Sequence, residues 1–117
     1  MISIVHTASL LGIYALPIIV EVDAARGLPQ ETIVGLPDKV VRESKNRIRS
    51  AIKYSGFEYP LRHYTINLSP AEFKKEGPIL DLAIAVGILR ATQQIPDDPN
   101  TLFIGELSLN GDLQASR

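Results

Sequence analysis

The sequence contains no cysteine, no tryptophan and only two histidines among its 117 residues. Without thiols, the chain can form neither disulfides nor thiolate zinc sites, which is compatible with a reducing cytosol. The formal net charge is −1, so no overall electrostatic field draws the protein to nucleic acids or to anionic membranes. The length corresponds to a single domain with a hydrophobic core of modest size.

Signals for targeting and membrane insertion are also missing. The first residues lack the basic stretch with which a secretory signal peptide begins. The longest apolar run, Leu82–Leu89, is far shorter than the ~18 residues that suggest a membrane span. We therefore expect a cytoplasmic protein that has no membrane partner.

The hydrophobic pattern predicts an α/β fold in which three strands precede the first helix. Apolar and polar residues alternate most clearly in residues 63–69, where Tyr64, Ile66 and Leu68 are expected to face the core. The Asn-Gly pair at 110–111 predicts a two-residue hairpin turn near the end of the chain. The predicted strands cover residues 2–7, 17–25, 31–35, 63–69 and 102–109, with a connector at 9–16.

The first predicted helix runs from the capping residue Asp38 to Ser55, and Gly56 ends it. Glu43 is expected to pair with Arg47 across one helical turn. The polar face carries Arg42, Asn46, Arg49 and Lys53, and the opposite, buried stripe consists of Val41, Ser44, Ile48, Ile52 and Ser55. On this assignment, Arg49→Ala changes the free energy of unfolding by no more than about 0.5 kcal/mol.

The second predicted helix covers residues 79–91 and is apolar nearly all round. Such a helix is expected at the centre of the core. Pro78 suits the first helical position because its φ angle is fixed. Asp81 is expected in the first turn, where a negative charge interacts favourably with the helix dipole.

Common catalytic and ligand-binding motifs are absent. The sequence has neither the phosphate-binding pattern G-x-x-x-x-G-K-[ST] nor the nucleophile pattern G-x-S-x-G. A single glycine, Gly35, precedes the first helix and favours a tight turn over an anion site. His6 and His63 are isolated, and Glu21 and Asp23 are explained equally well as a solvated strand face. We therefore predict no metal site.

Positive charge is concentrated in residues 39–75, which hold nine of the twelve basic residues and three acidic ones. A basic helix face can neutralise the phosphates of a nucleic acid, although a merely solvated face remains the alternative. Aromatic residues for base stacking are few in this segment: Phe57, Tyr59 and Tyr64. The candidate nucleic-acid-binding residues are Arg42, Arg49, Lys53, Lys74 and Lys75.

Five short stretches, spread in order over nearly the whole chain, carry a family resemblance. They are ASLLGI (8–13), VEVD (20–23), IVGLPD with VRES (33–38 and 41–44), NLSPA with KEGP and DL (67–71, 75–78 and 81–82) and GELSLNG (105–111). Each stretch alone is weak, but the five in register resemble the amino-terminal domain of the Mg-chelatase-like family. This family includes the ComM and YifB groups.

The resemblance implies a fold of the ribosomal protein S5 domain 2 type, which the Lon protease domain shares, with a mixed sheet and two main helices. In Lon-like proteases a catalytic serine follows a Gly-Pro pair, at the position of Ile79 in this chain. The partner lysine of that serine corresponds to a position beyond Arg117. Because Ile79 has no nucleophilic atom, the resemblance implies a domain without peptidase activity.

The resemblance further implies that residues 1–117 are a single amino-terminal domain, truncated before an AAA+ ATPase module. ATP and Mg²⁺ are expected to bind that module, and no cofactor is expected in this chain. The implied partners are the protein's own AAA+ module, neighbouring subunits of a hexamer, and DNA. The implied role is to support ring assembly and DNA contact during branch migration in natural transformation.

Two other functions remain open at this point. The first is a degenerate Lon-like peptidase whose nucleophile lies elsewhere, for which Ser69 is the nearest candidate. The second is a purely structural or protein-binding module that spaces subunits or recruits a partner.

Overall fold

The computed structural model describes residues 2–11, 14–34, 38–69, 77–96, 106–107 and 113–114. The order of its strands and helices is the predicted one, so the chain is an α/β protein. Its elements are β1 (Ile2–Leu11), β2 (Tyr14–Ala25), β3 (Gln30–Val34), α1 (Asp38–Tyr54), β4 (His63–Ser69), α2 (Gly77–Ala91), β5 (Glu106–Leu107) and β6 (Leu113–Gln114).

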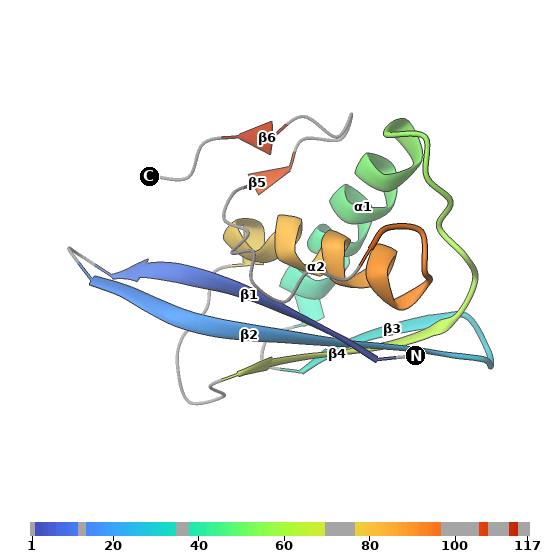
Figure 1. Ribbon diagram of the computed structural model, residues 1–117, viewed down its shortest axis with the longest axis horizontal. Helices are drawn as coiled ribbons and strands as arrows, with labels where there is room; N and C mark the ends of the chain where they lie inside the picture. Colours follow the sequence, from blue (N-terminus) through green and yellow to red (C-terminus); the bar gives the residue numbers. More distant parts are fainter. Residues whose placement is uncertain are drawn as a thin grey trace.

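Four strands form one mixed sheet in the order β1-β2-β4-β3. β2 pairs antiparallel with β1 and with β4, whereas β3 and β4 are parallel. Parallel neighbours need a crossover connection, and α1 supplies it between β3 and β4. Both helices lie on the same side of this sheet, so the domain has two layers (Figure 1). None of the described helices has the length and apolar character needed to cross a membrane.

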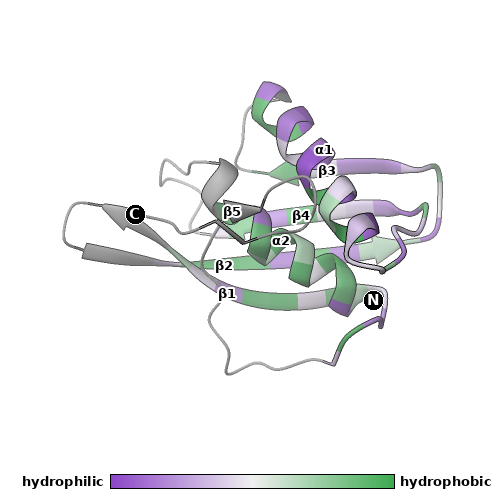
Figure 2. Cartoon of the chain, turned by 90° about the horizontal axis from the view of Figure 1, so that it is seen from above, coloured by the Kyte–Doolittle hydropathy of each residue, from purple (hydrophilic) through white to green (hydrophobic). Residues whose placement is uncertain are grey.

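The core lies between the sheet and α2. Side chains at alternate positions of the strands point toward the helices, and Tyr64, Ile66 and Leu68 are buried as predicted. α2 is buried on nearly all sides, which its apolar sequence requires. Figure 2 shows this contrast as hydrophobic colour along much of α2 and hydrophilic colour along much of α1.

At Gly87, α2 lies very close to the sheet. A Cβ atom at this position would lie 2.5 Å from Cγ2 of Val22, which is fully buried in β2. The hydroxyl of Ser3 in β1 donates a hydrogen bond to the Gly87 carbonyl oxygen at 2.7 Å. A glycine inside a helix is unfavourable on its own, so its use here is explained by this close packing.

The first hairpin is longer than the sequence predicts. β1 extends to Leu11 and β2 begins at Tyr14, so the predicted connector at 9–16 is wrong for most of its length. Strand pairing continues without a break from Ile2↔Asp23 to Leu11↔Tyr14. Side-chain alternation fades in this part of the sequence, but backbone hydrogen bonds continue the strands independently of it.

The final predicted strand, residues 102–109, is described only at β5. β5 pairs antiparallel with β6, with Leu107 opposite Leu113, in a sheet of its own. This antiparallel pairing agrees with a terminal hairpin. The predicted turn at 110–111 lies outside the described residues.

The buried stripe of α1 is mostly the predicted one. Ser44, Ile48 and Ile52 are 0–2% exposed, and Val41 packs partly against the core. The prediction was wrong for Ser55, which is exposed and follows the end of the helix at Tyr54.

An ion pair joins α1 to α2. It replaces the predicted Glu43–Arg47 pair and the predicted interaction of Asp81 with the helix dipole. Arg47 Nε donates to Asp81 Oδ2 at 2.5 Å, and Arg47 Nη2 donates to the Ser44 hydroxyl at 3.1 Å. The predicted pairing of Arg47 with Glu43 is therefore wrong, because Arg47 turns toward α2. Asp81 is fully buried and lies beyond the first turn, since α2 begins at Gly77. Its charge is balanced by Arg47 rather than by the helix dipole.

Candidate nucleic-acid interface

Helix α1 carries a row of basic side chains on the side away from α2. Arg42, Lys45, Arg49 and Lys53 recur at intervals of three and four residues, which places them along one side of the helix. We call these four residues the basic stripe. At 1.5 Å per residue, the stripe is about 16 Å long. Lys39, which is also exposed, lies at its margin.

The members of the stripe differ in exposure. Arg42 and Lys53, toward its two ends, are exposed. Lys45 and Arg49, in the middle, have 36% and 39% of their side chains exposed. The ends of the stripe therefore face solvent, whereas its middle is held by neighbouring residues.

Glu31 of β3 holds the middle of the stripe. Its side chain is only 7% exposed, with Oε2 at 3.2 Å from Lys45 Nζ and Oε1 at 3.7 Å from Arg49 Nη2. Tyr59 donates a hydrogen bond from its hydroxyl to Oε1. The Lys45 contact is an ion pair without a directed hydrogen bond, since Oε2 has no hydrogen-bond partner among the described residues. The carboxylate thus fixes two cations of α1 to the edge strand of the sheet.

Two tyrosines complete this support. The guanidinium of Arg49 lies 5.2 Å from the ring centroid of Tyr59, a cation–π distance. The rings of Tyr59 and Tyr64 are 5.5 Å apart and tilted by 52°. The Tyr64 hydroxyl donates to the Pro60 carbonyl oxygen at 2.6 Å. Burial raises the pKa of Tyr64 to about 12, partly opposed by Arg62, with a smaller raising effect from Glu31.

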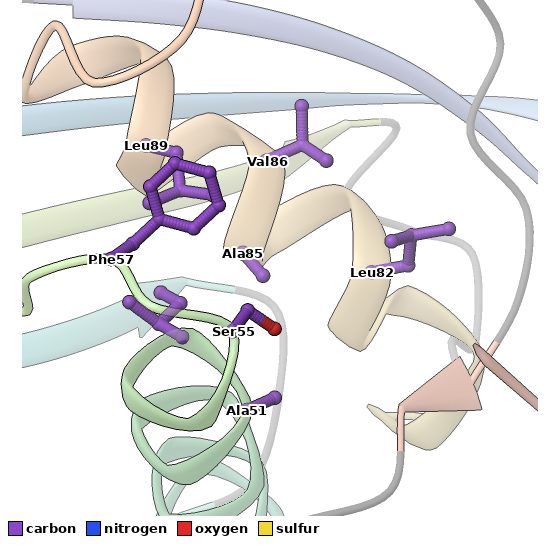
Figure 3. A pocket seen from close by; sticks show the side chains of 8 residues that line it. Ala51, Ser55, Phe57, Leu82, Ala85, Val86 and Leu89 are labelled. Atoms are coloured by element: carbon purple, nitrogen blue, oxygen red, sulfur yellow. The ribbon is translucent and has the colours of Figure 1, made fainter. Parts of the chain in front are cut away.

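A separate, apolar hollow lies between the end of α1 and the outer side of α2 (Figure 3). Its volume is about 130 Å³. The lining is apolar apart from Ser55, with Phe57 at one side and Leu82, Val86 and Leu89 from α2. Such a surface suits an apolar side chain of a protein partner better than a charged ligand.

Comparison with known proteins places the chain in a family. Residues 20–117 match the family described as subunit ChlI of Mg-chelatase. The chain belongs to this family. The resemblance read from the five sequence stretches is thereby confirmed.

Relatives in this ChlI-type family are much longer than this chain. Uncharacterized protein YifB of Escherichia coli (strain K12) is 48% identical over 114 residues, and competence protein ComM of Haemophilus influenzae is 41% identical over 116 residues. Each match covers 96% of this chain and 22% of the relative. An uncharacterized protein of Mycobacterium bovis is 41% identical over 100 residues, which are 84% of this chain and 20% of that relative. The chain therefore spans about a fifth of the length of these relatives.

The predicted contact residues of this ChlI-type chain fall into three groups. Arg42 and Lys53 are exposed on one side of α1, where the sequence places them. Arg49 lies between them but is half-buried against Tyr59 and close to a buried carboxylate, so it is not the freely solvated residue that the sequence suggested. Lys74 and Lys75 lie outside the described residues.

Sequence reasoning missed three residues of this surface, which line a small hollow beside α1: Lys45, Glu31 and Arg62. The spacing of Lys45 from Arg42 and Arg49 is a signal that was available, but Lys45 borders the buried stripe. Glu31 and Arg62 join the site only because β3, α1 and the segment before β4 fold together. No spacing rule along the chain would have identified them.

The alternatives read from the sequence can also be located in the fold. Ile79 is the third residue of α2, and Ser69 is the last residue of β4, opposite Ile19 in the sheet register. Glu21 accepts a 3.4 Å hydrogen bond from the Asn67 side-chain amide on the open face of the sheet. Within the described part of the chain, no group of three or more potential metal-ligating side chains occurs.

Proposed function

We propose that this chain is a non-catalytic accessory domain of a Mg-chelatase-like AAA+ protein, and that it contacts DNA through the basic stripe. Family membership and the greater length of the relatives support the first part. The basic stripe, exposed at both ends and fixed in its middle by Glu31, is the observation that carries the second. The name of one relative, competence protein ComM, supports a role in natural transformation. We propose that this role is DNA branch migration.

The domain architecture belongs to the same proposal. Three strands, a helix, a strand and a second helix, with sheet order β1-β2-β4-β3, support a fold of the ribosomal protein S5 domain 2 type. Residues 1–117 form one such domain, joined in the whole protein to an AAA+ module that binds ATP and Mg²⁺ and assembles as a cytoplasmic hexamer. Ile79, in the first turn of α2, takes the place of the Lon-type serine.

Electrostatics explains why four cations suffice for a measurable contact. Each phosphate that a cation neutralises releases condensed counterions, so affinity depends strongly on salt. Four such contacts to duplex DNA give a slope of about −3.6 for the logarithm of the binding constant against the logarithm of salt concentration. A single domain with this charge binds weakly in physiological salt, and several copies on a ring raise the effective concentration.

Titration of a fluorescently labelled DNA with this chain at low salt tests the proposal. Arg42→Ala and Lys53→Ala are expected to weaken binding and to reduce the salt slope by about one each. Arg26→Ala is the matched control, because Arg26 is an exposed arginine of the β2–β3 turn and does not belong to the basic stripe. No binding by the wild-type chain, or equal weakening by Arg26→Ala, contradicts a specific role of the stripe.

The apolar hollow favours a second candidate function, the docking of another protein. Phe57→Asp places a charge at the wall of the hollow without changing the basic stripe. If the hollow contacts a neighbouring subunit or module, this variant weakens assembly of the full-length protein in analytical ultracentrifugation and leaves DNA binding by the chain unchanged. A serine-reactive probe tests the absence of peptidase activity, since labelling of the chain would reveal a nucleophilic serine.

A further inference from the structure

The middle of the basic stripe borders a second, polar hollow. It lies between α1, the start of β3 and the segment before β4, and it has a volume of about 30 Å³. Its polar lining comes from Gln30, Glu31, Lys45, Arg49, Tyr59 and Arg62. We propose that this hollow is a phosphate subsite that receives one oxygen of a phosphate group. The inference deepens the proposed DNA contact and rests on it for the biological source of the phosphate.

The charges around the hollow favour an anion. Three cations, Lys45, Arg49 and Arg62, surround one carboxylate, that of Glu31, which leaves an excess of two positive charges. The carboxylate is already engaged by the Tyr59 hydroxyl and by Lys45. It therefore positions the cations and offsets only one of their three charges. Arg62 comes from a different segment than the other two cations, so the charge converges from two sides.

Arg49, which lines the hollow, carries a hydrogen-bond donor that no described residue uses. Its Nε atom is buried and has no hydrogen-bond partner among the described residues. Its Nη2 atom lies 3.7 Å from Glu31 Oε1, which is too far for a hydrogen bond. Stacking on Tyr59 nevertheless holds the guanidinium in place. A fixed guanidinium with unused donors is suited to a phosphate, which accepts two parallel N–H bonds from arginine.

The size of the hollow indicates how the phosphate is presented. Pockets that enclose whole small molecules have volumes of roughly 300–1,000 Å³, an order of magnitude more than this hollow. One oxygen atom fits, while the remainder of the ligand stays outside in solvent. This arrangement suits a phosphodiester of an extended strand that continues along the stripe toward Arg42 and Lys53. It does not suit an enclosed mononucleotide.

Nitrogen-15 NMR of the whole chain tests the subsite, because the Nε–H group of arginine gives its own signal. Inorganic phosphate is added in place of chloride at constant ionic strength, and a short oligonucleotide is added in a second titration. We expect the Arg49 Nε–H signal, assigned with Arg49→Lys, to shift in a saturable way in both titrations. Arg62→Gln is expected to weaken the phosphate response several-fold, whereas Arg42→Ala leaves it unchanged and weakens only the oligonucleotide response.

The outcomes separate this inference from the proposed function. A shift with inorganic phosphate in a protein that does not bind the oligonucleotide supports the subsite, assigns it to free phosphate and contradicts the DNA contact. Oligonucleotide binding without any shift of the Arg49 signal retains the DNA contact and overturns the subsite. An Arg49 signal that is insensitive to inorganic phosphate, or equally sensitive in Arg62→Gln, overturns the subsite as well and assigns the hollow to water.

Discussion

Arg47 in α1 and Asp81 in α2 form an ion pair across the interface of the two helices, with Nε 2.5 Å from Oδ2. The Asp81 side chain is completely buried, whereas that of Arg47 is 25% exposed. Loss of the arginine therefore removes a cation from beside a fully buried carboxylate. This arrangement makes the pair more sensitive to the removal of one partner than an ion pair at the surface.

We expect Arg47→Leu to lower the free energy of unfolding by roughly 3–5 kcal/mol, the usual effect of removing one partner of a buried pair. Urea unfolding of the two proteins measures the difference. Glu43→Ala, on the exposed side of the same helix, is the control and is expected to change it by less than about 0.5 kcal/mol. A loss below about 1 kcal/mol for Arg47→Leu would show that Asp81 is balanced by another group.

Gly87→Ala is expected to destabilise the domain, although alanine is the better helix former by about 1 kcal/mol. The added Cβ meets Val22 Cγ2 at 2.5 Å in a fully packed region, and such overpacking costs about 1–3 kcal/mol. The double variant with Val22→Ala provides the test, because it removes the atom that clashes. If the losses of unfolding free energy in the two single variants add up to the loss in the double variant, the proposed contact is contradicted.

The fold was largely predictable because hydrophobic spacing reflects burial directly. β4 was predicted with its observed bounds, since Tyr64, Ile66 and Leu68 alternate with polar residues and are 1% exposed. α2 was identified as the buried helix from its composition alone. The extension of the first hairpin was not predictable, because backbone pairing sustains it after the side-chain alternation has faded.

The candidate site was predictable only in part, for the same physical reason. Exposed residues such as Arg42 and Lys53 follow from helical spacing. The partners of Arg49 do not, because Glu31 and Tyr59 lie 18 and 10 residues away in the sequence and meet it only in the folded chain. Spacing along a helix shows which residues share a side, but it does not show what another element brings to that side.

The surroundings of Arg49 change the expected effect of its removal. A solvated arginine would leave stability unchanged within about 0.5 kcal/mol, which is the expectation from the sequence. In the structure, its side chain is 39% exposed, its guanidinium stacks on Tyr59, and it faces the buried carboxylate of Glu31. We expect Arg49→Ala to destabilise the domain by about 1–2 kcal/mol, from the lost cation–π contact and the weaker balance of Glu31.

Chemical denaturation of Arg49→Ala beside Arg42→Ala measures this difference, because Arg42 is an exposed arginine of the same helix. Equal stability of the two variants would indicate that Arg49 is solvated and that its contact with Glu31 has no structural role. If Arg49→Ala loses more stability than Arg42→Ala, the contribution of Arg49 to DNA binding must be measured with Arg49→Lys, which keeps the charge.

Tyr64 connects the stability of the domain to alkaline pH. Its pKa rises from 10.0 to about 12 because burial disfavours the phenolate, with Arg62 opposing the shift. The folded state therefore holds the proton more tightly than the unfolded state. The resulting stabilisation is fully present below pH 10 and is lost as the pH rises from 10 to about 12.

Unfolding free energies measured between pH 9 and 12 for the wild-type chain and Tyr64→Phe isolate this contribution, because ionisation of the other tyrosines is common to both proteins. We expect the wild type to lose stability more steeply than Tyr64→Phe in this interval. The Tyr64 hydroxyl, which the variant lacks, releases its proton when the wild type unfolds. At pH 9 we expect the variant to be less stable by about 1 kcal/mol, since it lacks the hydrogen bond to the Pro60 carbonyl. Parallel curves for the two proteins across the whole range would mean that Tyr64 titrates like an exposed tyrosine, and would remove burial as the cause of its raised pKa.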